Sequence, residues 1–245
     1  MSLIYGFHHI CFDKNGKEIF EEQLKTIRDS GLYDASQIIF CSVLGDKKNY
    51  ILPSKYEVIY RSKDSKAYER PVIEHMYKHS LANPGKYWYI HTKGISHFGT
   101  KRYEPVHDWR VYMEYYIIKN WRRCVADLDN YDIAGVNYAT NPSHYSGNFW
   151  WARSSYIKTN NTPFNYQDYY ETEMWLCKGK NPIGISYHTS NTPHYDKRYL
   201  PSKYEGYPQI PLIFTPGLSE TICNNGAVNE NLDFNNFEII APRNA

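Results

Sequence analysis

The chain has 245 residues and a mass of 29.0 kDa, which suits one large domain or one domain with appendages. Hydrophobic residues make up 42% and charged residues 22%, as in an ordinary globular protein. The net charge of +2 and the isoelectric point near 8.1 argue against nucleic-acid binding through a basic surface. Aromatic residues reach 17%, and such rings either fill a core or stack on sugars and bases.

The spacing of the cysteines and the N-terminal sequence indicate in which cellular compartment the protein is expected. The five cysteines, at positions 11, 41, 124, 177 and 223, include no Cys-x-x-Cys pair, so their spacing supports neither a disulfide framework nor a zinc knuckle. The N-terminus lacks a basic region followed by an apolar one, and no apolar run approaches membrane-spanning length. We therefore expect a soluble, cytoplasmic protein without a membrane span.

Strand patterns alternate with helix patterns through the first half of the chain. Apolar runs predict strands over residues 3–12, 37–44, 55–60 and 87–90. Apolar residues at helical spacing predict helices over residues 20–27 and 65–81. This alternation is typical of an α/β fold with a mostly parallel sheet.

The second half opens with the longest helix pattern, over residues 108–128. Its apolar stripe comprises Trp109, Met113, Ile117, Trp121, Cys124 and Leu128. Asp108 stands where an N-cap is expected. Arg110 lies in the first turn, off the stripe, where it can face a cleft, although most arginines in such a position are simply solvated. The later patterns predict a strand over 131–138, a loop over 141–153 that enters an aromatic strand, a helix over about 166–177 and a strand over 181–187.

These elements predict one domain with a tail. Residues 1–200 are expected to form a single α/β domain, with a mostly parallel central sheet flanked by helices. Residues 201–245, rich first in Pro and then in Asn, are expected to form an extended C-terminal tail that wraps the domain or leads away from it.

Polar residues follow the aromatic run at 87–90 directly. His91, Thr92, Lys93 and Gly94 come where a buried central strand ends, and open α/β sheets bind ligands just beyond the carboxyl ends of their strands. The stretch is therefore either a polar binding site on a rigid support or a surface turn whose polar side chains face water. The segments that follow favour the binding site.

Three ordered segments carry a family resemblance. They are His91-Thr92-Lys93 with Ser96, then Asp108-Trp109-Arg110, then the stretch from Ser146 to Arg153, S-G-N-F-W-W-A-R. Together they resemble the H-T-K…W-R pattern and a later aromatic Ala-Arg element of rhamnan-synthesis (RgpF-like) glycosyltransferases. Gly31-Leu32-Tyr33-Asp34 and Tyr68-Glu69-Arg70-Pro71 look like further landmarks of short GT-A-type sequences.

The resemblance spans about residues 3–195 and implies a fold and an activity. The fold would be a single GT-A-like domain of Rossmann type. The activity would be transfer of a sugar from a UDP- or dTDP-type nucleotide sugar, as co-substrate, to a hydroxyl of a glycan or glycolipid acceptor. Such a reaction serves polysaccharide or glycoconjugate synthesis.

The chain departs from the GT-A pattern at the metal site. Most GT-A enzymes carry Asp-x-Asp at the strand end where this chain has His91-Thr92-Lys93, and Mg²⁺ and Mn²⁺ prefer oxygen ligands. Dependence on Mn or Mg is therefore uncertain. We expect Lys93, with His91, Thr92 and the Gly94 amide, to stabilise the leaving diphosphate in place of a metal, with help from Arg110 or His188. Asp127-Leu128-Asp129 closes the long helix and is expected to face solvent.

An inverting transfer needs a general base for the acceptor hydroxyl. Asp168, Glu171 and Glu173 are candidates, and helical spacing prevents all three from serving because 173 points away from the other two. Glu173, two residues before Trp175, matches the acidic residue that precedes a tryptophan in similar enzymes. A solvated helix face is the alternative for each of these acids.

Further contacts follow from the same comparison. Donor contacts are expected from Phe7, His8, His9, Arg61, Ser62 and Tyr68, together with Thr92, Gly94 and Arg110. The acceptor is expected against Asn148, Trp150 and Glu171, where aromatic planes pack on sugar faces. His188 is a weak candidate for a metal ligand, and it and His194 are alternatively phosphate contacts or plain loop residues.

A second class of function stays open. A carbohydrate-binding protein that kept a glycosyltransferase-like fold without catalysis would also have abundant aromatic residues and lack Asp-x-Asp. Binding of single-stranded nucleic acid through stacked aromatics would require a basic stripe, which the near-neutral charge disfavours.

Overall fold

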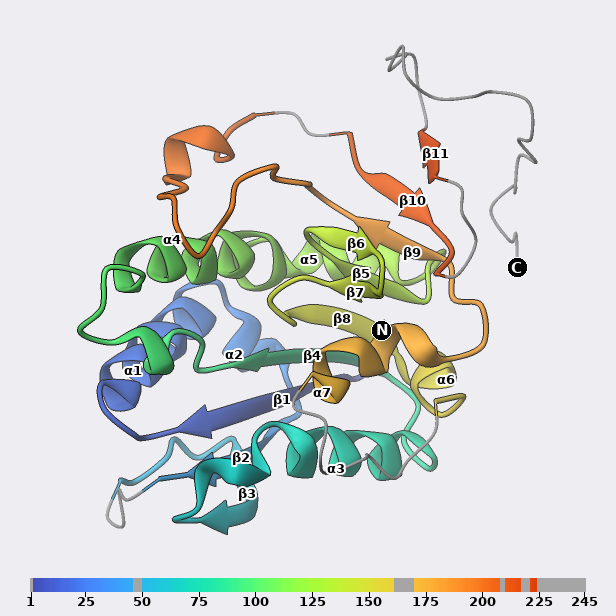
Figure 1. Ribbon diagram of the computed structural model, residues 1–245. Coiled ribbons are helices and arrows are strands. Elements are labelled where there is room, and N and C mark those ends of the chain that lie inside the picture. The colour runs from blue at the N-terminus through green and yellow to red at the C-terminus, as the bar shows by residue number, and fades with distance from the viewer. Residues whose placement is uncertain (1, 46–49, 161–169, 208–209, 217–220, 224–245) are drawn as a thin grey trace.

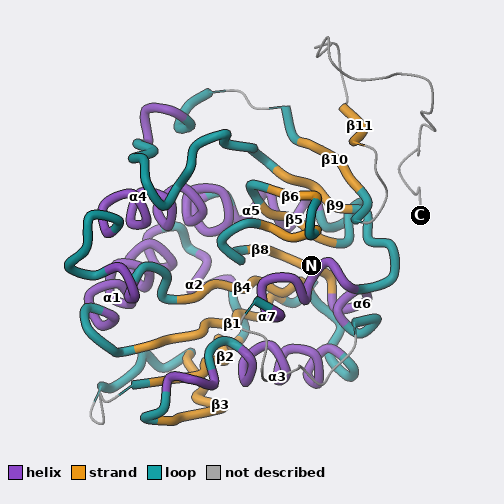
Figure 2. Tube along the Cα trace, in the orientation of Figure 1, coloured by secondary structure: helices purple, strands orange, loops and turns teal. Residues whose placement is uncertain are grey.

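The computed structural model describes residues 2–45, 50–160, 170–207, 210–216 and 221–223. One large sheet runs through the molecule, with helices on both faces (Figures 1 and 2). The fold is therefore α/β, as the alternating patterns predicted. None of the helices in the described part of the chain combines the length and the apolar character that a membrane span requires.

The central sheet is mixed and mostly parallel. Its strands in chain order are β1 (Ile4–Cys11), β2 (Ile38–Leu44), β3 (Tyr56–Ser62), β4 (Lys86–His91), β5 (Ile133–Gly135), β8 (Trp150–Arg153), β9 (Gly184–Ser186), β10 (Leu212–Phe214) and β11 (Thr221–Cys223). They lie side by side in the order β11-β10-β9-β5-β8-β4-β1-β2-β3. Only β8 and β10 run against the other strands of this described sheet. Strands β6 (Tyr138–Thr140) and β7 (Ser143–Tyr145) form a separate hairpin.

Helices of very different length connect the strands. The α-helices are α1 (Gly16–Asp29), α2 (Leu32–Ala35), α3 (Arg70–Ser80), α4 (Tyr103–Glu114), α5 (Trp121–Asp127), α6 (Ser154–Ile157) and α7 (Glu171–Met174). A π-helical segment, η3 (Tyr115–Lys119), joins α4 to α5. Short 3₁₀ turns are η1 (Ser65–Ala67), η2 (Ile95–His97), η4 (Trp175–Lys178) and η5 (Pro201–Lys203).

The pleat of the central strands divides the buried residues into two cores. In β4, Trp88 and Ile90 join the core under α1, α4 and α5, whereas Tyr87 and Tyr89 join the core under α3 and α6. Side chains alternate between the two faces of a strand, so a continuous apolar run is what a strand covered on both faces requires. This explains why the run at 87–90 predicted a buried strand.

The long helix pattern predicted the buried residues of the helix correctly, but it placed the first residue of the helix wrongly. All six stripe residues are buried. The helix begins at Tyr103 rather than at Asp108, and η3 and Asn120 interrupt it. Asp108 is not an N-cap: its buried carboxylate accepts hydrogen bonds from the Arg198 guanidinium and, at 3.2 Å, from the Tyr199 backbone N–H. An aspartate can serve either as an N-cap or as an ion-pair partner of a distant residue, and only the fold shows which role it has.

Two other elements differ from their patterns. The predicted helix over 65–81 is divided, because Tyr68 adopts a φ of +48° between η1 and α3. Residues 166–169 of the predicted helix over 166–177 lie outside the described residues, and α7 with η4 covers most of the rest. The predicted strand over 131–138 is divided into β5 and the first residue of β6.

The segment after residue 200 contributes to the sheet and to the core. Tyr204 is buried, and β10 pairs with β9 in antiparallel register. The part of the expected tail from 224 onwards lies outside the described residues. The division of the chain at residue 200 stays a prediction.

Arg110 does not face a cleft but lies in a buried ion-pair network. Its guanidinium donates to Glu114 at 2.9 Å and also pairs with Glu22, and both Arg110 and Glu114 are nearly fully buried. Removing one partner of such a network leaves an uncompensated buried charge, which typically costs about 3–5 kcal/mol.

We therefore expect Arg110→Met to lower the free energy of unfolding by about 3–5 kcal/mol, measured by urea denaturation. The double variant Arg110→Met with Glu114→Leu should recover most of this loss, because no buried carboxylate is left unpaired. Equal stability of the wild type and the single variant would contradict a buried network.

Candidate functional site

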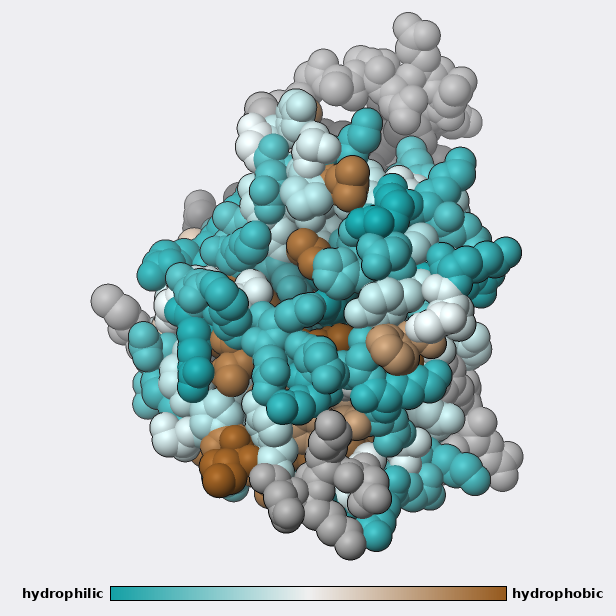
Figure 3. All heavy atoms as spheres, turned by 90° about the vertical axis from the view of Figure 1, so that its left-hand side faces the viewer, coloured by the Kyte–Doolittle hydropathy of each residue, from teal (hydrophilic) through white to brown (hydrophobic). Residues whose placement is uncertain are grey.

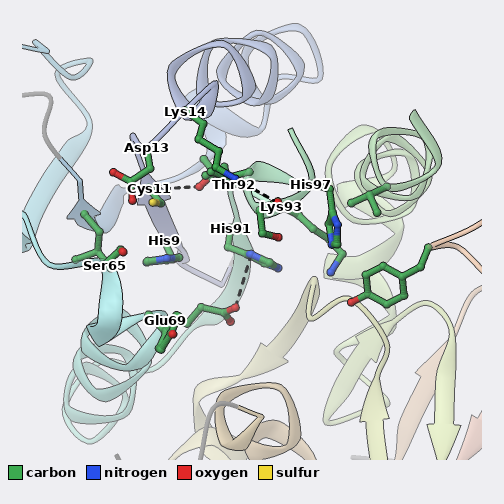
Figure 4. Close-up of a pocket in the computed structure, with 17 residues that line it drawn as sticks. His9, Cys11, Asp13, Lys14, Ser65, Glu69, His91, Thr92, Lys93 and His97 are labelled. Atoms are coloured by element: carbon green, nitrogen blue, oxygen red, sulfur yellow. Dashed lines mark hydrogen bonds and ion pairs between the residues drawn. The ribbon is translucent and has the colours of Figure 1, made fainter. Parts of the chain in front are cut away.

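The candidate site lies where the carboxyl ends of β1 and β4 meet. The order β3-β2-β1-β4 is that of a doubly wound sheet, in which ligands bind just beyond the carboxyl ends of the strands. Thr92 joins the two strand ends: its hydroxyl accepts the Cys11 N–H at 2.9 Å, and its own N–H donates to the His9 carbonyl at 3.0 Å (Figure 4). The two strand ends that carry the site are therefore joined to each other by hydrogen bonds.

Two adjoining cavities open at this point. The first, of about 310 Å³, is lined by the ends of β1 and β4, by the loop before α3 and by η2. The second, of about 550 Å³, is lined by the β7–β8 loop, by α7 and by Trp109 of α4. The residues common to both linings are Glu69, His91, Lys93, His97 and Tyr195. The face of the molecule that holds the ends of these strands is largely hydrophilic (Figure 3).

Lys93 sits in the wall between the two cavities. Its ammonium lies 4.0 Å from the centroid of the Trp109 ring, a cation–π contact. No carboxylate of the described residues forms an ion pair with it, and burial lowers the pKa of Lys93, while the charges of Glu173 and Glu69 partly oppose the shift. A desolvated cation without a direct counter-ion interacts strongly with an anionic group that comes close to it.

Gly94 gives the chain its turn after Lys93. Its φ of +108° is a conformation that L side chains rarely adopt. The turn leads the chain from the end of β4 into η2, and Lys93, directly before it, lines both cavities. A side chain at position 94 would strain this backbone, so the polar stretch 91–94 has a structural reason for its glycine.

His91 lies at the centre of the site and is neutral. Its Nε2 donates to the Gly147 carbonyl at 3.1 Å, and its Nδ1 is 3.7 Å from the Glu69 carboxylate. Burial lowers the pKa of His91 to about 3, and the nearby Lys93 ammonium adds to the shift. Nδ1 thus presents a lone pair to the site, and Figure 4 shows the ring pointing toward Glu69.

Glu69 is the site residue that sequence reasoning missed. Its carboxylate accepts hydrogen bonds from the Tyr89 hydroxyl at 2.7 Å and from the Asn148 amide at 2.6 Å, and it lines both cavities. Its position directly before Arg70-Pro71, at the N-terminus of α3, was the available signal. The residues that hold it come from β4 and from the β7–β8 loop, and only the fold shows that they converge.

The second cavity brings Glu173 and Asn148 together. Glu173 accepts the Gly147 N–H at 2.8 Å and lies 4.0 Å from His144 Nε2. Trp150 does not line the cavity: its indole N–H supports Asn148 from behind at 2.8 Å.

Two of the candidate acids are not found with Glu173. Glu171 turns toward Lys178, with a closest distance of 3.8 Å, and lines neither cavity. Asp168 lies outside the described residues.

The predicted donor residues divide into two groups. His9, Tyr68, Thr92 and Gly94 line the first cavity. Phe7, His8, Arg61, Ser62 and Arg110 line neither cavity. The alternation along β1 explains part of this division, because neighbouring residues of a strand face opposite sides of the sheet.

His188 and the acidic pair at the end of the long helix lie away from the site. The Tyr112 hydroxyl contacts His188 Nδ1 at 2.9 Å. Asp127 pairs with Arg123, and Asp129 pairs with Lys86. Within the described residues no three His, Cys, Asp or Glu side chains converge as metal ligands usually do.

Buried histidines make the protein sensitive to acid. Burial lowers the pKa of His8 to about 3, of His9 to about 4 and of His91 to about 3, from 6.5. In the unfolded chain these rings take up protons below pH 6.5, whereas in the folded chain they stay neutral down to about pH 4. The free energy of unfolding should therefore fall as pH falls through this window, by about 1.4 kcal/mol per pH unit for each ring.

Urea titrations at several pH values between 6.5 and about 4 measure this slope. His8→Gln should lower the slope by the contribution of one ring, because glutamine takes up no proton. The fold should be kept, since a glutamine amide can hydrogen-bond to Gln23 and Tyr56. An identical slope in the variant would mean that His8 is already protonated in the folded protein.

Comparisons with known proteins bear on the region that carries this site. A family described as a domain of unknown function (DUF8361) matches residues 8–200, a range that contains every lining residue of the two cavities. No curated protein and no solved structure matches the chain. Because the match extends over most of its length, the chain belongs to the DUF8361 family.

Proposed function

We propose that this protein is a glycosyltransferase that moves a sugar from a UDP- or dTDP-type nucleotide sugar to a hydroxyl of a glycan or glycolipid, on a GT-A-like version of the α/β fold. The observation that carries the proposal is the pair of adjoining cavities with Lys93 and His91 in their common wall. A transferase needs two substrate sites that meet at the reacting atoms. The first cavity, at the carboxyl ends of β1 and β4, suits the nucleotide, and the second suits the acceptor.

Lys93 has the central role in this mechanism. When the bond between the sugar and the diphosphate breaks, its electron pair stays with the diphosphate, which gains negative charge. A desolvated ammonium stabilises this charge more strongly than a solvated one, since the local dielectric constant is low. Thr92 and the Gly94 amide lie beside Lys93 at the end of β4 and can donate hydrogen bonds to the same phosphates.

Glu173 has the role of general base if the transfer inverts the anomeric carbon. One carboxylate oxygen is held by the Gly147 N–H, which leaves the other free to take the proton of the acceptor hydroxyl. The hydroxyl oxygen then forms the bond to the sugar as the bond to the diphosphate breaks. Asn148, beside Glu173, would hold the acceptor.

Glu69 and His91 position these groups. Glu69 links Asn148 on the acceptor side to Tyr89 of β4, and His91 ties β4 to the Gly147 carbonyl. Both contacts end on the β7–β8 loop that also holds Glu173. The cation and the base would therefore keep a fixed separation.

The proposed mechanism includes no Mn²⁺ or Mg²⁺ ion. The His, Cys, Asp and Glu side chains that line the first cavity are His9, Cys11, Asp13, Glu69, His91 and His97, and Lys93 lies among them. These described residues do not form a group suited to hold a metal, so we derive no step through one.

Carbohydrate binding without catalysis is the second candidate. Trp109, Tyr170 and Tyr195 line the second cavity, and aromatic planes pack on the apolar faces of sugars. This reading needs no leaving group and gives no role to the desolvated ammonium of Lys93.

A thermal-shift panel of UDP- and dTDP-sugars and of neutral oligosaccharides tests the proposal. A ligand that binds the folded state raises the melting temperature by mass action. A shift with nucleotide sugars that Tyr68→Ala reduces would support a donor site in the first cavity. Shifts with oligosaccharides alone would favour the binding protein, and no shift with any nucleotide sugar would contradict the transferase.

A further inference from the structure

A third cavity lies apart from the two site cavities. It has a volume of about 310 Å³ and shares no lining residue with either of them. We call it the tyrosine cavity. Its lining consists of Tyr115, Tyr116, Asn120, Arg123, Tyr187, Tyr204 and Tyr207. These residues come from η3, from α5, from the end of β9 and from the segment around η5. The segment 190–207, orange in Figure 1, passes along α4 and meets it through contacts such as that between Tyr199 and Tyr112.

The π-helical turn shapes this cavity. The Asn120 N–H donates to the Tyr115 carbonyl at 3.1 Å, one residue further back than in an α-helix, and the Asn120 side-chain amide donates to the same carbonyl at 2.8 Å. The wider turn displaces Tyr115 and Tyr116 from the regular helical positions. π-Turns inside helices are found frequently at functional sites.

The cavity has rings and unused hydrogen-bonding groups together. The Oδ1 of Asn120 accepts no hydrogen bond from a described residue, and the buried hydroxyls of Tyr116 and Tyr204 have no partner among the described residues. Arg123 lies with its guanidinium 4.8 Å from the centroid of the Tyr187 ring. The two hydroxyls are enclosed, so the polar groups that a ligand in the cavity can reach beside the tyrosine rings are the Asn120 amide oxygen and the Arg123 guanidinium.

The charges around the cavity cancel. Arg123 pairs with Asp127, and Lys119 pairs with Glu205, each at 3.5 Å. A site for a diphosphate would carry an excess of positive charge, which these pairs do not leave. A ligand with an apolar face, several hydroxyls and no charge fits this combination of phenol rings, amide and guanidinium.

We infer that the tyrosine cavity binds a neutral sugar unit of a glycan, at a site separate from the two cavities at the strand ends. Trp109 and Tyr116 are seven residues apart on one helix, which is about 10 Å along its axis. A glycan held in the tyrosine cavity would thus lie near the second cavity without occupying it. The inference stands whether or not the protein transfers sugars.

The test is a titration of the full chain with neutral tetrasaccharides of glucose, galactose and rhamnose, followed by calorimetry and saturation-transfer NMR. Tyr207→Ala and Arg123→Gln change exposed members of the cavity, and each should weaken binding about five- to tenfold. Tyr60→Ala, an exposed tyrosine on β3 at the far edge of the sheet, is the matched control and should leave affinity unchanged.

Three results would overturn the inference. One is that no tetrasaccharide binds. A second is that binding survives both cavity variants but is lost in Tyr170→Ala, which places the glycan in the second cavity. A third is that the two variants weaken binding of UDP instead, which makes the tyrosine cavity a nucleotide site.

Discussion

A Lys93→Met variant is expected to lose about 10²- to 10³-fold in turnover of nucleotide sugar, the usual cost of removing one preorganised group that stabilises developing charge. The loss should appear in kcat more than in the affinity for the donor, because the charge on the diphosphate grows in the transition state. Donor turnover measured by release of nucleoside diphosphate gives both quantities.

The same variant should be as stable as the wild type or more stable. Burial lowers the pKa of Lys93, which means that the folded protein disfavours the charged form, and methionine removes that penalty. A gain in melting temperature together with a loss of turnover is typical of a residue kept for function. Lys25→Met, at an exposed position of α1, is the matched control, and unchanged turnover in Lys93→Met would remove the proposed role.

A Glu173→Gln variant is expected to lose about 10²- to 10⁴-fold in transfer to an acceptor, the range that general-base catalysis contributes. The amide oxygen of glutamine can still accept the Gly147 N–H, so the loop should keep its position. Donor binding, measured separately by thermal shift, should not change, because Glu173 lines only the second cavity.

Glu18→Gln, in an exposed turn of α1, controls for the loss of one negative charge. Transfer at the wild-type rate in Glu173→Gln would exclude this residue as the base. Glu69, the other carboxylate that lines the second cavity, would then be the remaining candidate for the base.

The strands and the apolar faces of the helices could be predicted because periodicity is a local property. The run at 87–90 and the stripe from Trp109 to Leu128 are buried where their patterns placed them. Shorter strands such as β9 and β10 have three residues each and depend on neighbours for their pairing. A pattern of this length does not distinguish a strand from a loop.

The site could be predicted only in part, for the same physical reason. The polar stretch from His91 to Gly94 lies at the end of β4, so the pattern of that strand alone was enough to predict its place in the site. The contacts of Glu69 with Tyr89 and Asn148 join segments 20 and 79 residues apart, and the pairing of Asp108 with Arg198 joins segments 90 residues apart. Sequence spacing holds no information on such convergence.

For Arg110 the sequence suggested a place in a site, whereas the structure shows a buried residue. An arginine off the apolar stripe, near the start of a helix, suggested a solvated or cleft-facing cation. Glu22 of α1 and Glu114 of α4 neutralise it inside the protein instead. Charged residues are rarely buried unless they are paired, and a pair between helices is not visible in one helix alone.

The central claim is most directly tested by measuring release of UDP or dTDP from nucleotide sugars in EDTA and in Mn²⁺, with and without a glycan acceptor. The account predicts release that depends on the acceptor, survives EDTA and falls about 10²- to 10³-fold in Lys93→Met. Release that requires Mn²⁺ and is indifferent to Lys93→Met would contradict the proposed role of this lysine, and binding of oligosaccharides without any release would contradict the transferase itself.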